Sequence, residues 1–314
     1  MSAIGELARM RRRPTRDRRP LSARDKKEER AGYAFLSPWL IGLFVITIGP
    51  MAASLYLSFT DYSFLDSPEW IGLENYQRLF SDTRFHQAIG VTFRYVIVSV
   101  PLQLVVALLV AMVLDRGIRG LALYRSAFYL PSLIGGSVAI AILWRQIFGA
   151  DGLVNWALAL IGIEGRSWIA NPDTALGTLI VLNVWTFGAP MIIFLAGLRQ
   201  IPAMYYEAAS VDGAGVLRRF WNITIPILTP IIFFNLILQL IGAFQAFTQA
   251  FIISGGSGAP SDSTLFYTLY LYMEGFGNFS MGYASAMAWV LVVIIGTFTL
   301  INFIASKYWV FYDD

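Results

Sequence analysis

Residues 207–226 read EAASVDGAGVLRRFWNITIP, a stretch of small and polar side chains in an otherwise apolar chain. Alanine favours a helix and glycine ends it, so residues 207–212 predict a short helix that stops at Gly213. Residues 216–222 predict a second short helix, which we expect to end before Pro226 because proline interrupts helical hydrogen bonding. The stretch therefore predicts a helix–turn–helix projection.

Six apolar segments lie before and after this projection, and each is long enough to cross a membrane as a helix, which takes about 20 residues. They span residues 34–59, 89–114, 121–146, 174–198, 225–253 and 283–306. Of the 314 residues, 57% are hydrophobic and 14% are charged, which is too apolar for a soluble domain. The sequence predicts an all-α membrane protein with six transmembrane helices, of which the fourth and fifth flank the projection.

Lysine and arginine are distributed unevenly around these segments. If both termini are cytoplasmic, 18 of the 23 basic residues lie on the cytoplasmic side, 11 of them before residue 32. Positive residues resist translocation, so we expect this topology, with the projection in a cytoplasmic loop at 199–224. Residues 1–32 are expected to form a disordered basic tail and residues 33–314 the membrane domain. The tail's charge also suits nucleic acid or anionic lipid, but its role in topology explains it, and we expect no nucleic-acid partner.

The ionisable residues argue against several classes of protein. No carboxylate falls in the middle of an apolar segment, which disfavours an ion-coupled secondary carrier. Lysine occurs only at Lys26, Lys27 and Lys307, so the chain has no phosphate-binding loop for ATP. His86 is the only histidine and there is no cysteine. We therefore expect no catalytic residues, no metal site and no cofactor bound by this chain, and hence no enzyme.

The projection resembles the docking loop of ABC importer permeases, whose pattern is E-A-A-x-x-x-G-x(9)-I-x-L-P. Residues 207–209 and Gly213 match this pattern, as do residues 223–226 except for Ile225. Other stretches resemble the carbohydrate-uptake branch of that family, in its large maltose permease or glycerol-phosphate permease type. These are residues 71–76, Asn155 with Trp156, Ile201 with Pro202, Gly255 with Gly256, and residues 281–284.

The resemblance implies the type I ABC importer permease fold and an assembly of several proteins. The chain would pair with a second permease as a heterodimer, two ATPase subunits would carry ATP and Mg²⁺, and an extracytoplasmic sugar-binding protein would deliver the substrate. The implied ATPase-docking residues are Glu207, Ala208, Ala209, Asp212, Gly213 and Ala214. The implied location is the plasma membrane of a prokaryote, which the chain crosses several times.

The resemblance also implies a substrate pocket near the middle of the membrane. The candidates, in the segments that flank the docking loop, are Asn183, Trp185, Gln239, Gln245 and Gln249. Asn183 and Trp185 match an Asn-x-Trp pattern, Gln245 lies near the place of an amide in the large maltose permease subunit, and the other two rest on chemistry. Amides and an indole ring suit sugar hydroxyls without burying a charge. Alternatively, these amides only hydrogen-bond neighbouring helices, at about 0.6 kcal/mol each.

These features together predict the permease subunit of an ATP-driven, binding-protein-dependent importer of a sugar or oligosaccharide. One alternative keeps the family and changes the cargo to glycerol phosphate or another sugar-like anion, with Arg94 or Arg145 as the counter-charge. The other alternative is a secondary carrier, which the missing intramembrane carboxylates disfavour.

Overall fold

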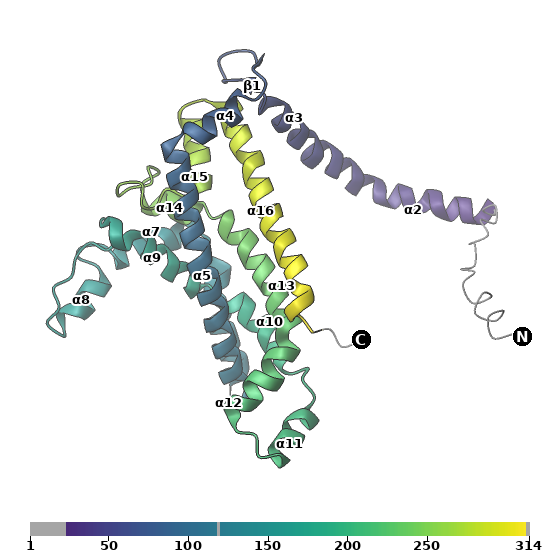
Figure 1. The fold of residues 1–314 in the computed structure, drawn as a ribbon, viewed down its shortest axis with the longest axis vertical. Helices are drawn as coiled ribbons and strands as arrows, with labels where there is room; N and C mark the ends of the chain where they lie inside the picture. Colours follow the sequence, from purple (N-terminus) through teal and green to yellow (C-terminus); the bar gives the residue numbers. More distant parts are fainter. Residues whose placement is uncertain (1–22, 118–119, 312–314) are drawn as a thin grey trace, which may run out of the picture. The chain divides into compact units, whose positions relative to one another are not determined.

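A computed structural model describes residues 23–117 and 120–311, and this part of the chain is mostly helical (Figure 1). The chain divides into two compact units, residues 1–54 and 55–314. The candidate functional residues all lie in the second unit.

A helix that begins in the first unit and ends three residues past its boundary changes its hydrogen-bonding pattern along its length. It starts as α2 (Ala23–Gly42) and continues through the π-helical segment η1 (Leu43–Ile48) into α3 (Gly49–Leu57). The basic tail expected at 1–32 is therefore helical from the start of α2 onward, rather than disordered. Residues 1–22, the rest of that tail, lie outside the described part of the chain.

The second unit is built from helices and one two-stranded antiparallel ribbon. The ribbon is β1 (Thr60–Asp61) with β2 (Glu69–Trp70). The helices that follow are α4 (Glu74–Ser81), α5 (Thr83–Asp115), α6 (Leu121–Ile134), α7 (Val138–Ile147), α8 (Leu153–Ala159), α9 (Pro172–Trp185), α10 (Gly188–Leu198), α11 (Ala203–Val211), α12 (Val216–Arg219), η2 (Phe220–Thr224), α13 (Ile225–Phe244), α14 (Thr248–Ile253), α15 (Tyr267–Tyr272), η3 (Met273–Gly277) and α16 (Met281–Trp309).

Several of these helices are long and apolar enough to cross a membrane. Four do so singly: Arg30–Leu57, Thr83–Asp115, Val216–Ile253 and Met281–Trp309. Two further candidates are bent pairs, α6 with α7 at 99° and α9 with α10 at 42°. If each bent pair is one span, the described residues hold up to six, one for each predicted segment. The cytoplasmic placement of the termini stays a prediction.

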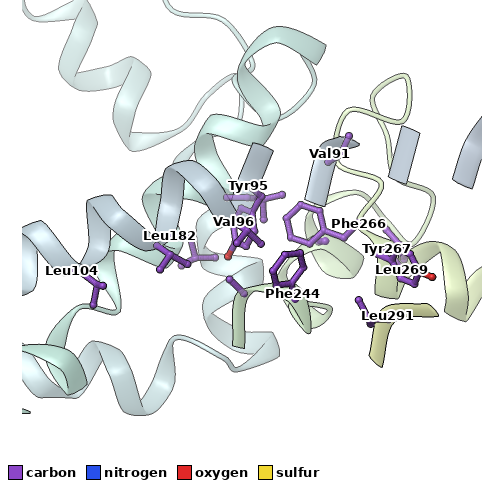
Figure 2. Close-up of a cluster of buried hydrophobic side chains, with 14 of the residues drawn as sticks. Val91, Tyr95, Val96, Leu104, Leu182, Phe244, Phe266, Tyr267, Leu269 and Leu291 are labelled. Atoms are coloured by element: carbon purple, nitrogen blue, oxygen red, sulfur yellow. The ribbon is translucent and has the colours of Figure 1, made fainter. Parts of the chain in front are cut away.

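The long helix α5 forms the centre of the second unit and packs against α9, α10, α13 and α15. Its buried face carries small and β-branched side chains, including Ala88, Val91 and Val96, which let neighbouring helices approach closely. Figure 2 shows this face meeting Phe244 of α13 and Phe266, the residue before α15, in one apolar cluster. Because α5 packs against these four helices, it sets their positions around the candidate site.

The breaks in the two bent pairs lie against each other and leave little space. A Cβ built on Gly135, in the α6–α7 break, would lie 2.3 Å from Cγ2 of Thr186, which follows α9. A Cβ on Gly188, at the start of α10, would lie 2.2 Å from the Phe128 carbonyl oxygen. The predicted continuous helix at 121–146 is therefore wrong. Glycine permits the close approach, and the chain turns sharply before α7 begins.

The helix expected at 216–222 does not end before Pro226. Instead, α12, η2 and α13 follow one another without interruption through that proline. Proline lacks an N–H and crowds the carbonyl four residues before it, and the wider π-helical turn of η2 directly precedes α13 and accommodates this. The projection is thus continuous with a membrane helix.

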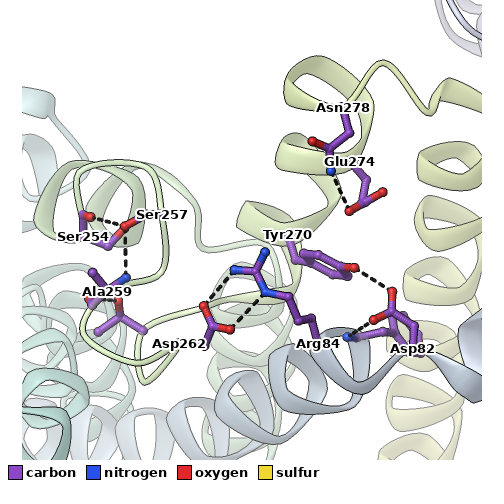
Figure 3. Close-up of polar contacts among 11 residues, drawn as sticks. Asp82, Arg84, Ser254, Ser257, Ala259, Asp262, Tyr270, Glu274 and Asn278 are labelled. Carbon is purple, nitrogen blue, oxygen red and sulfur yellow. Dashed lines mark hydrogen bonds and ion pairs between the residues drawn. The ribbon is translucent and has the colours of Figure 1, made fainter.

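Two ion pairs join segments that are far apart in the sequence, and Figure 3 shows the first of them, between Arg84 and Asp262. Arg84, in the first turn of α5, donates two hydrogen bonds to the Asp262 carboxylate, at 2.8 and 3.0 Å. Arg78 of α4 pairs with the buried Glu274 of η3 at 3.2 Å. These contacts attach α4 and α5 to the region around α15.

Candidate functional site

The projection predicted at 207–226 is formed by α11 and α12 at one end of the second unit (Figure 1). Gly213 has a φ of +75°, and its N–H donates to the Ser210 carbonyl at 3.1 Å. The Ala214 N–H donates to the Ala209 carbonyl at 2.8 Å. This pair of bonds is the Schellman helix ending, which needs a left-handed residue that glycine adopts without strain. The expected helix end at Gly213 is confirmed.

The predicted docking residues lie on the outer surface of this projection. Those that are exposed are Glu207, Ala208, Asp212 and Gly213, and those that are half-buried are Ala209 and Ala214. Neighbouring apolar side chains are exposed as well, Val211 at 89% and Leu217 at 75%. Exposed apolar groups gathered on a projecting element mark an interaction surface.

Two side-chain hydrogen bonds fasten α11 to the segment that leads into α13. The hydroxyls of Tyr206 and Thr224 lie 2.9 Å apart, within hydrogen-bonding distance. The Arg219 guanidinium donates to Oγ of Ser210 at 3.3 Å. With the continuous helix from α12 to α13, these bonds attach the projection to the membrane helix.

A cavity of about 430 Å³ lies between the projection and the ends of α5 and α10. Its walls include Arg116, Leu198 and Val216. Asp115 and Arg199, at the ends of α5 and α10, form an ion pair of 3.4 Å. Packing beneath the projection is thus incomplete, and the direct mechanical connection to the membrane part is the continuous helix.

The predicted pocket residue Asn183 belongs to a polar cluster around the helix breaks. Its side-chain amide donates to Oε1 of Gln103 at 3.3 Å. Gln103, buried on α5, in turn donates to the carbonyl and to Oγ1 of Thr186, at 3.2 and 3.1 Å. Ser132 also donates to that carbonyl, at 2.9 Å. The helix break leaves the Thr186 carbonyl without a helical hydrogen-bond partner, and these side chains donate to it instead. Such a partner is needed because the membrane interior holds no water to supply the hydrogen bond.

Trp185 and Gln249 contact the same two breaks. The Trp185 ring lies 5.8 Å from the ring of Trp144 on α7, centroid to centroid. Gln249 of α14 donates to the Gly135 carbonyl at 3.2 Å. Three of the five predicted pocket residues, Asn183 among them, therefore gather where α6–α7 and α9–α10 bend.

The other two predicted pocket residues occupy different surroundings. Gln245 is exposed at the end of α13, where the helix breaks before α14. Gln239 is half-buried, six residues earlier on α13, which is about 9 Å along the helix axis. Gln245 is thus the predicted amide most open to a ligand. By contrast, the Asn183 amide donates to the Gln103 side chain, and the Gln249 amide donates to the Gly135 carbonyl.

Sequence reasoning missed Gln103 and Ser132, which bind the Thr186 carbonyl together. Gln103 could have been recognised from the sequence, because it is the only amide side chain in the apolar run at 89–114. A second signal was the adjacent glycines Gly135 and Gly136, which mark the break.

The remaining charged candidates differ in their surroundings. Nε of Arg94 donates to the Gly90 carbonyl of its own helix at 3.3 Å. His86 is exposed in the first turn of α5. Among residues 23–117 and 120–311, no group of three or more His, Cys, Asp and Glu side chains is arranged to hold a metal ion.

The second unit is therefore that of a multi-pass membrane protein with a projecting element for a partner. A family described as binding-protein-dependent transport system inner membrane component matches residues 80–309, most of the chain. The chain belongs to this family, the permease subunits of ABC importers. It is a transport component of the plasma membrane and not an enzyme.

Relatives match nearly the whole chain. The probable ABC transporter permease protein YesP of Bacillus subtilis (strain 168) is 56% identical, over 92% of this chain and 94% of its own length. The lactose transport system permease protein LacF of Rhizobium radiobacter is 33% identical, over 88% and 94%. The trehalose/maltose transport system permease protein MalF of Thermococcus litoralis (strain ATCC 51850 / DSM 5473 / JCM 8560 / NS-C) is 29% identical, over 88% and 93%.

Solved structures show the same fold. A chain from a bacterial ABC transporter that imports the acidic polysaccharide alginate has a TM-score of 0.75 at 24% identity, over 90% of this chain and 97% of that one. A chain of a bacterial alginate ABC transporter in complex with an alginate pentasaccharide-bound periplasmic protein has a TM-score of 0.79, over 90% and 96%. The expected ABC importer permease fold is confirmed.

Proposed function

We propose that this chain is the permease subunit, of the large maltose permease type, in an ATP-driven importer of an oligosaccharide. The observation that carries the proposal is the exposed α11 helix with its glycine ending at Gly213. The turn at this glycine leads into α12, which is continuous with the membrane helix α13. That geometry suits a lever that a partner protein moves. The relatives' names add the cargo, since they include lactose, trehalose/maltose and starch degradation products.

The proposed assembly supplies what this chain lacks. Two ATPase subunits would hold the projection through Glu207, Ala208, Ala209, Asp212, Gly213 and Ala214, and they would bind the ATP and Mg²⁺. A second permease subunit would complete the pathway as a heterodimer. An extracytoplasmic sugar-binding protein would deliver the oligosaccharide, as the family description requires a binding protein.

In the proposed mechanism the two helix breaks form part of the pathway. Closure of the ATPases would pull α11 and α12 and, through the continuous helix, move α13 and the break at Gln245. Trp185 and Gln245 would contact the sugar, with Asn183, Gln239 and Gln249 lining or supporting the same region. Uncharged amides and indoles suit this task because they match sugar hydroxyls in both donor and acceptor roles.

Reconstitution tests the proposal. The tagged full-length chain is purified from its own membranes with its associated subunits, placed in lipid vesicles, and supplied with its binding protein and labelled oligosaccharides. We expect uptake that needs both ATP and the binding protein. Uptake by this chain alone, driven by an ion gradient, would instead establish a secondary carrier.

A further inference from the structure

A cavity of about 370 Å³ lies beside the helix breaks, where the last turn of α7 meets the end of α14. Its lining includes Arg145 of α7, Ser254 directly after α14, Ser167 and Ile169 from the segment before α9, and Pro260 from the loop after α14. In Figure 1, α7 and α14 lie well away from α11 and α12, the docking helices. The cavity is thus separate from the projection.

Arg145 brings an uncompensated positive charge to this cavity. Arg78, Arg84 and Arg199 each pair with a carboxylate, but within residues 23–117 and 120–311 no carboxylate lies within ion-pair distance of Arg145. The residues that line the cavity include none either. Arg145 lies in the last turn of α7, and a cation near a helix C-terminus interacts favourably with the helix dipole. This interaction stabilises the guanidinium without a carboxylate partner, so the guanidinium is available to bind an anion.

Ser254 adds an unsatisfied hydroxyl to the same wall. The residue is only 8% exposed, and within the described chain its Oγ has no hydrogen-bond partner. Its carbonyl is occupied, since Oγ of Ser257 donates to it at 2.9 Å (Figure 3). A buried hydroxyl without a partner costs about 1–3 kcal/mol, so it would gain by turning toward an acceptor held at Arg145.

The cavity lies close to the polar cluster. Arg145 is seven residues along α7 from the helix start at Val138, which corresponds to about 10 Å. Ser254 is five residues beyond Gln249, which corresponds to about 8 Å. A ligand of several sugar units is long enough to reach from the cluster into the cavity.

The charge of the cavity selects among anions. Among the residues that the structure describes, Arg145 is the only lysine or arginine in the lining. One guanidinium balances one carboxylate, which it binds through two parallel hydrogen bonds. A phosphate monoester carries about −1.5 to −2 at neutral pH and needs a second cation. A carboxylate therefore fits this cavity better than glycerol phosphate does.

We infer that the Arg145 cavity binds the carboxylate of a uronic acid unit, so that the imported oligosaccharide is an acidic one. This inference rests on the proposed function, because it specifies the substrate class of the same importer. The guanidinium forms the ion pair, and the Ser254 hydroxyl donates to the sugar acid once it turns toward it.

The test uses the whole importer in vesicles with its binding protein. The probes are trisaccharides from pectin and from alginate, their carboxyl-reduced neutral counterparts, and glycerol phosphate. The variants are Arg145→Gln, Arg145→Lys and Arg166→Gln, the last of which removes an exposed arginine that does not line the cavity. Arg145 is exposed, so its replacement leaves folding intact, which the melting temperature verifies.

We expect uptake of at least one acidic trisaccharide by the wild type. Arg145→Gln should lower its kcat/KM by about tenfold or more, as expected for a lost charged hydrogen bond, and leave uptake of neutral sugars unchanged. Lysine should restore part of the loss, and Arg166→Gln should have no effect. Three results would overturn the inference but not the proposed importer function. They are uptake of neutral sugars only, uptake of glycerol phosphate that depends on Arg145, and an equal loss of uptake for acidic and neutral probes in Arg145→Gln. Uptake of no saccharide at all would overturn the proposed function as well.

Discussion

The carboxylate of Asp82 accepts a hydrogen bond of 2.6 Å from the hydroxyl of Tyr270, which lies 188 residues further along the chain (Figure 3). The same carboxylate accepts from the Tyr283 hydroxyl at 2.6 Å and caps α5 through the Phe85 N–H at 3.1 Å. Partial burial opposes ionisation, but these hydrogen bonds outweigh it and hold the pKa of Asp82 below the ordinary value of 3.8. One carboxylate therefore holds α5, α15 and α16 together.

Acid should weaken this junction. Because the folded-state pKa of Asp82 is lowered, its stabilisation is complete above the ordinary value of 3.8 and is lost as the pH falls through the folded value. We expect the melting temperature of the wild type to fall more steeply below about pH 4 than that of Asp82→Asn. Asp151→Asn, at an exposed aspartate, is the control and should follow the wild type. Parallel curves for all three proteins would contradict a special role for Asp82.

The glycine ending of α11 provides a matched pair of variants. Gly162 ends α8 with the same two hydrogen bonds and a φ of +76°, against +75° for Gly213. A Cβ at either glycine meets no atom within 4 Å, so proline acts only on the backbone. We expect Gly213→Pro to lower uptake by about 30-fold, as for a lost interface anchor, and Gly162→Pro to leave uptake near normal. Equal uptake by the two variants would contradict docking at Gly213.

Gln103→Leu should destabilise the helix breaks. The substitution removes both hydrogen bonds to Thr186 and leaves the Asn183 amide without its acceptor, at a cost of about 1–3 kcal/mol. We expect a lower melting temperature in detergent together with reduced uptake. Gln103→Glu keeps an acceptor for Asn183, but it replaces the donor to the Thr186 carbonyl by a buried carboxylate and should destabilise at least as much. An unchanged melting temperature for the leucine variant would show that the cluster does not stabilise the breaks.

Gln245→Ala should behave differently, because this amide is exposed at a helix end. We expect the melting temperature and basal ATP hydrolysis by the assembled importer to stay unchanged, while the substrate concentration for half-maximal uptake rises by about fivefold, the effect of one lost hydrogen bond. An unaltered dependence of uptake on sugar concentration would remove Gln245 from the pocket.

The features that sequence reasoning identified depend on neighbouring residues. The glycine ending at Gly213 follows from its own short stretch, and the long helices follow from the lengths of apolar runs. The cytoplasmic side of the loop rests on charge counting and stays a prediction.

The features that sequence reasoning missed depend on distant contacts. Gln103 meets Thr186 from 83 residues away, so the apolar run around it did not reveal its partner. The 99° bend between α6 and α7 lies inside a run that reads as one span. Pro226 seemed to end a helix, although the π-helical turn before it lets the helix continue.

The most direct measurement of docking uses the absence of cysteine from this chain. A single cysteine in place of Val211, which is 89% exposed, or of Leu65, which is 85% exposed, is labelled by a maleimide in the presence and absence of the ATPase subunits, without the binding protein. We expect the ATPases to protect the cysteine at position 211 and to leave the one at position 65 reactive. Equal labelling at position 211 with and without the ATPases would contradict the claim that energy enters through α11 and α12.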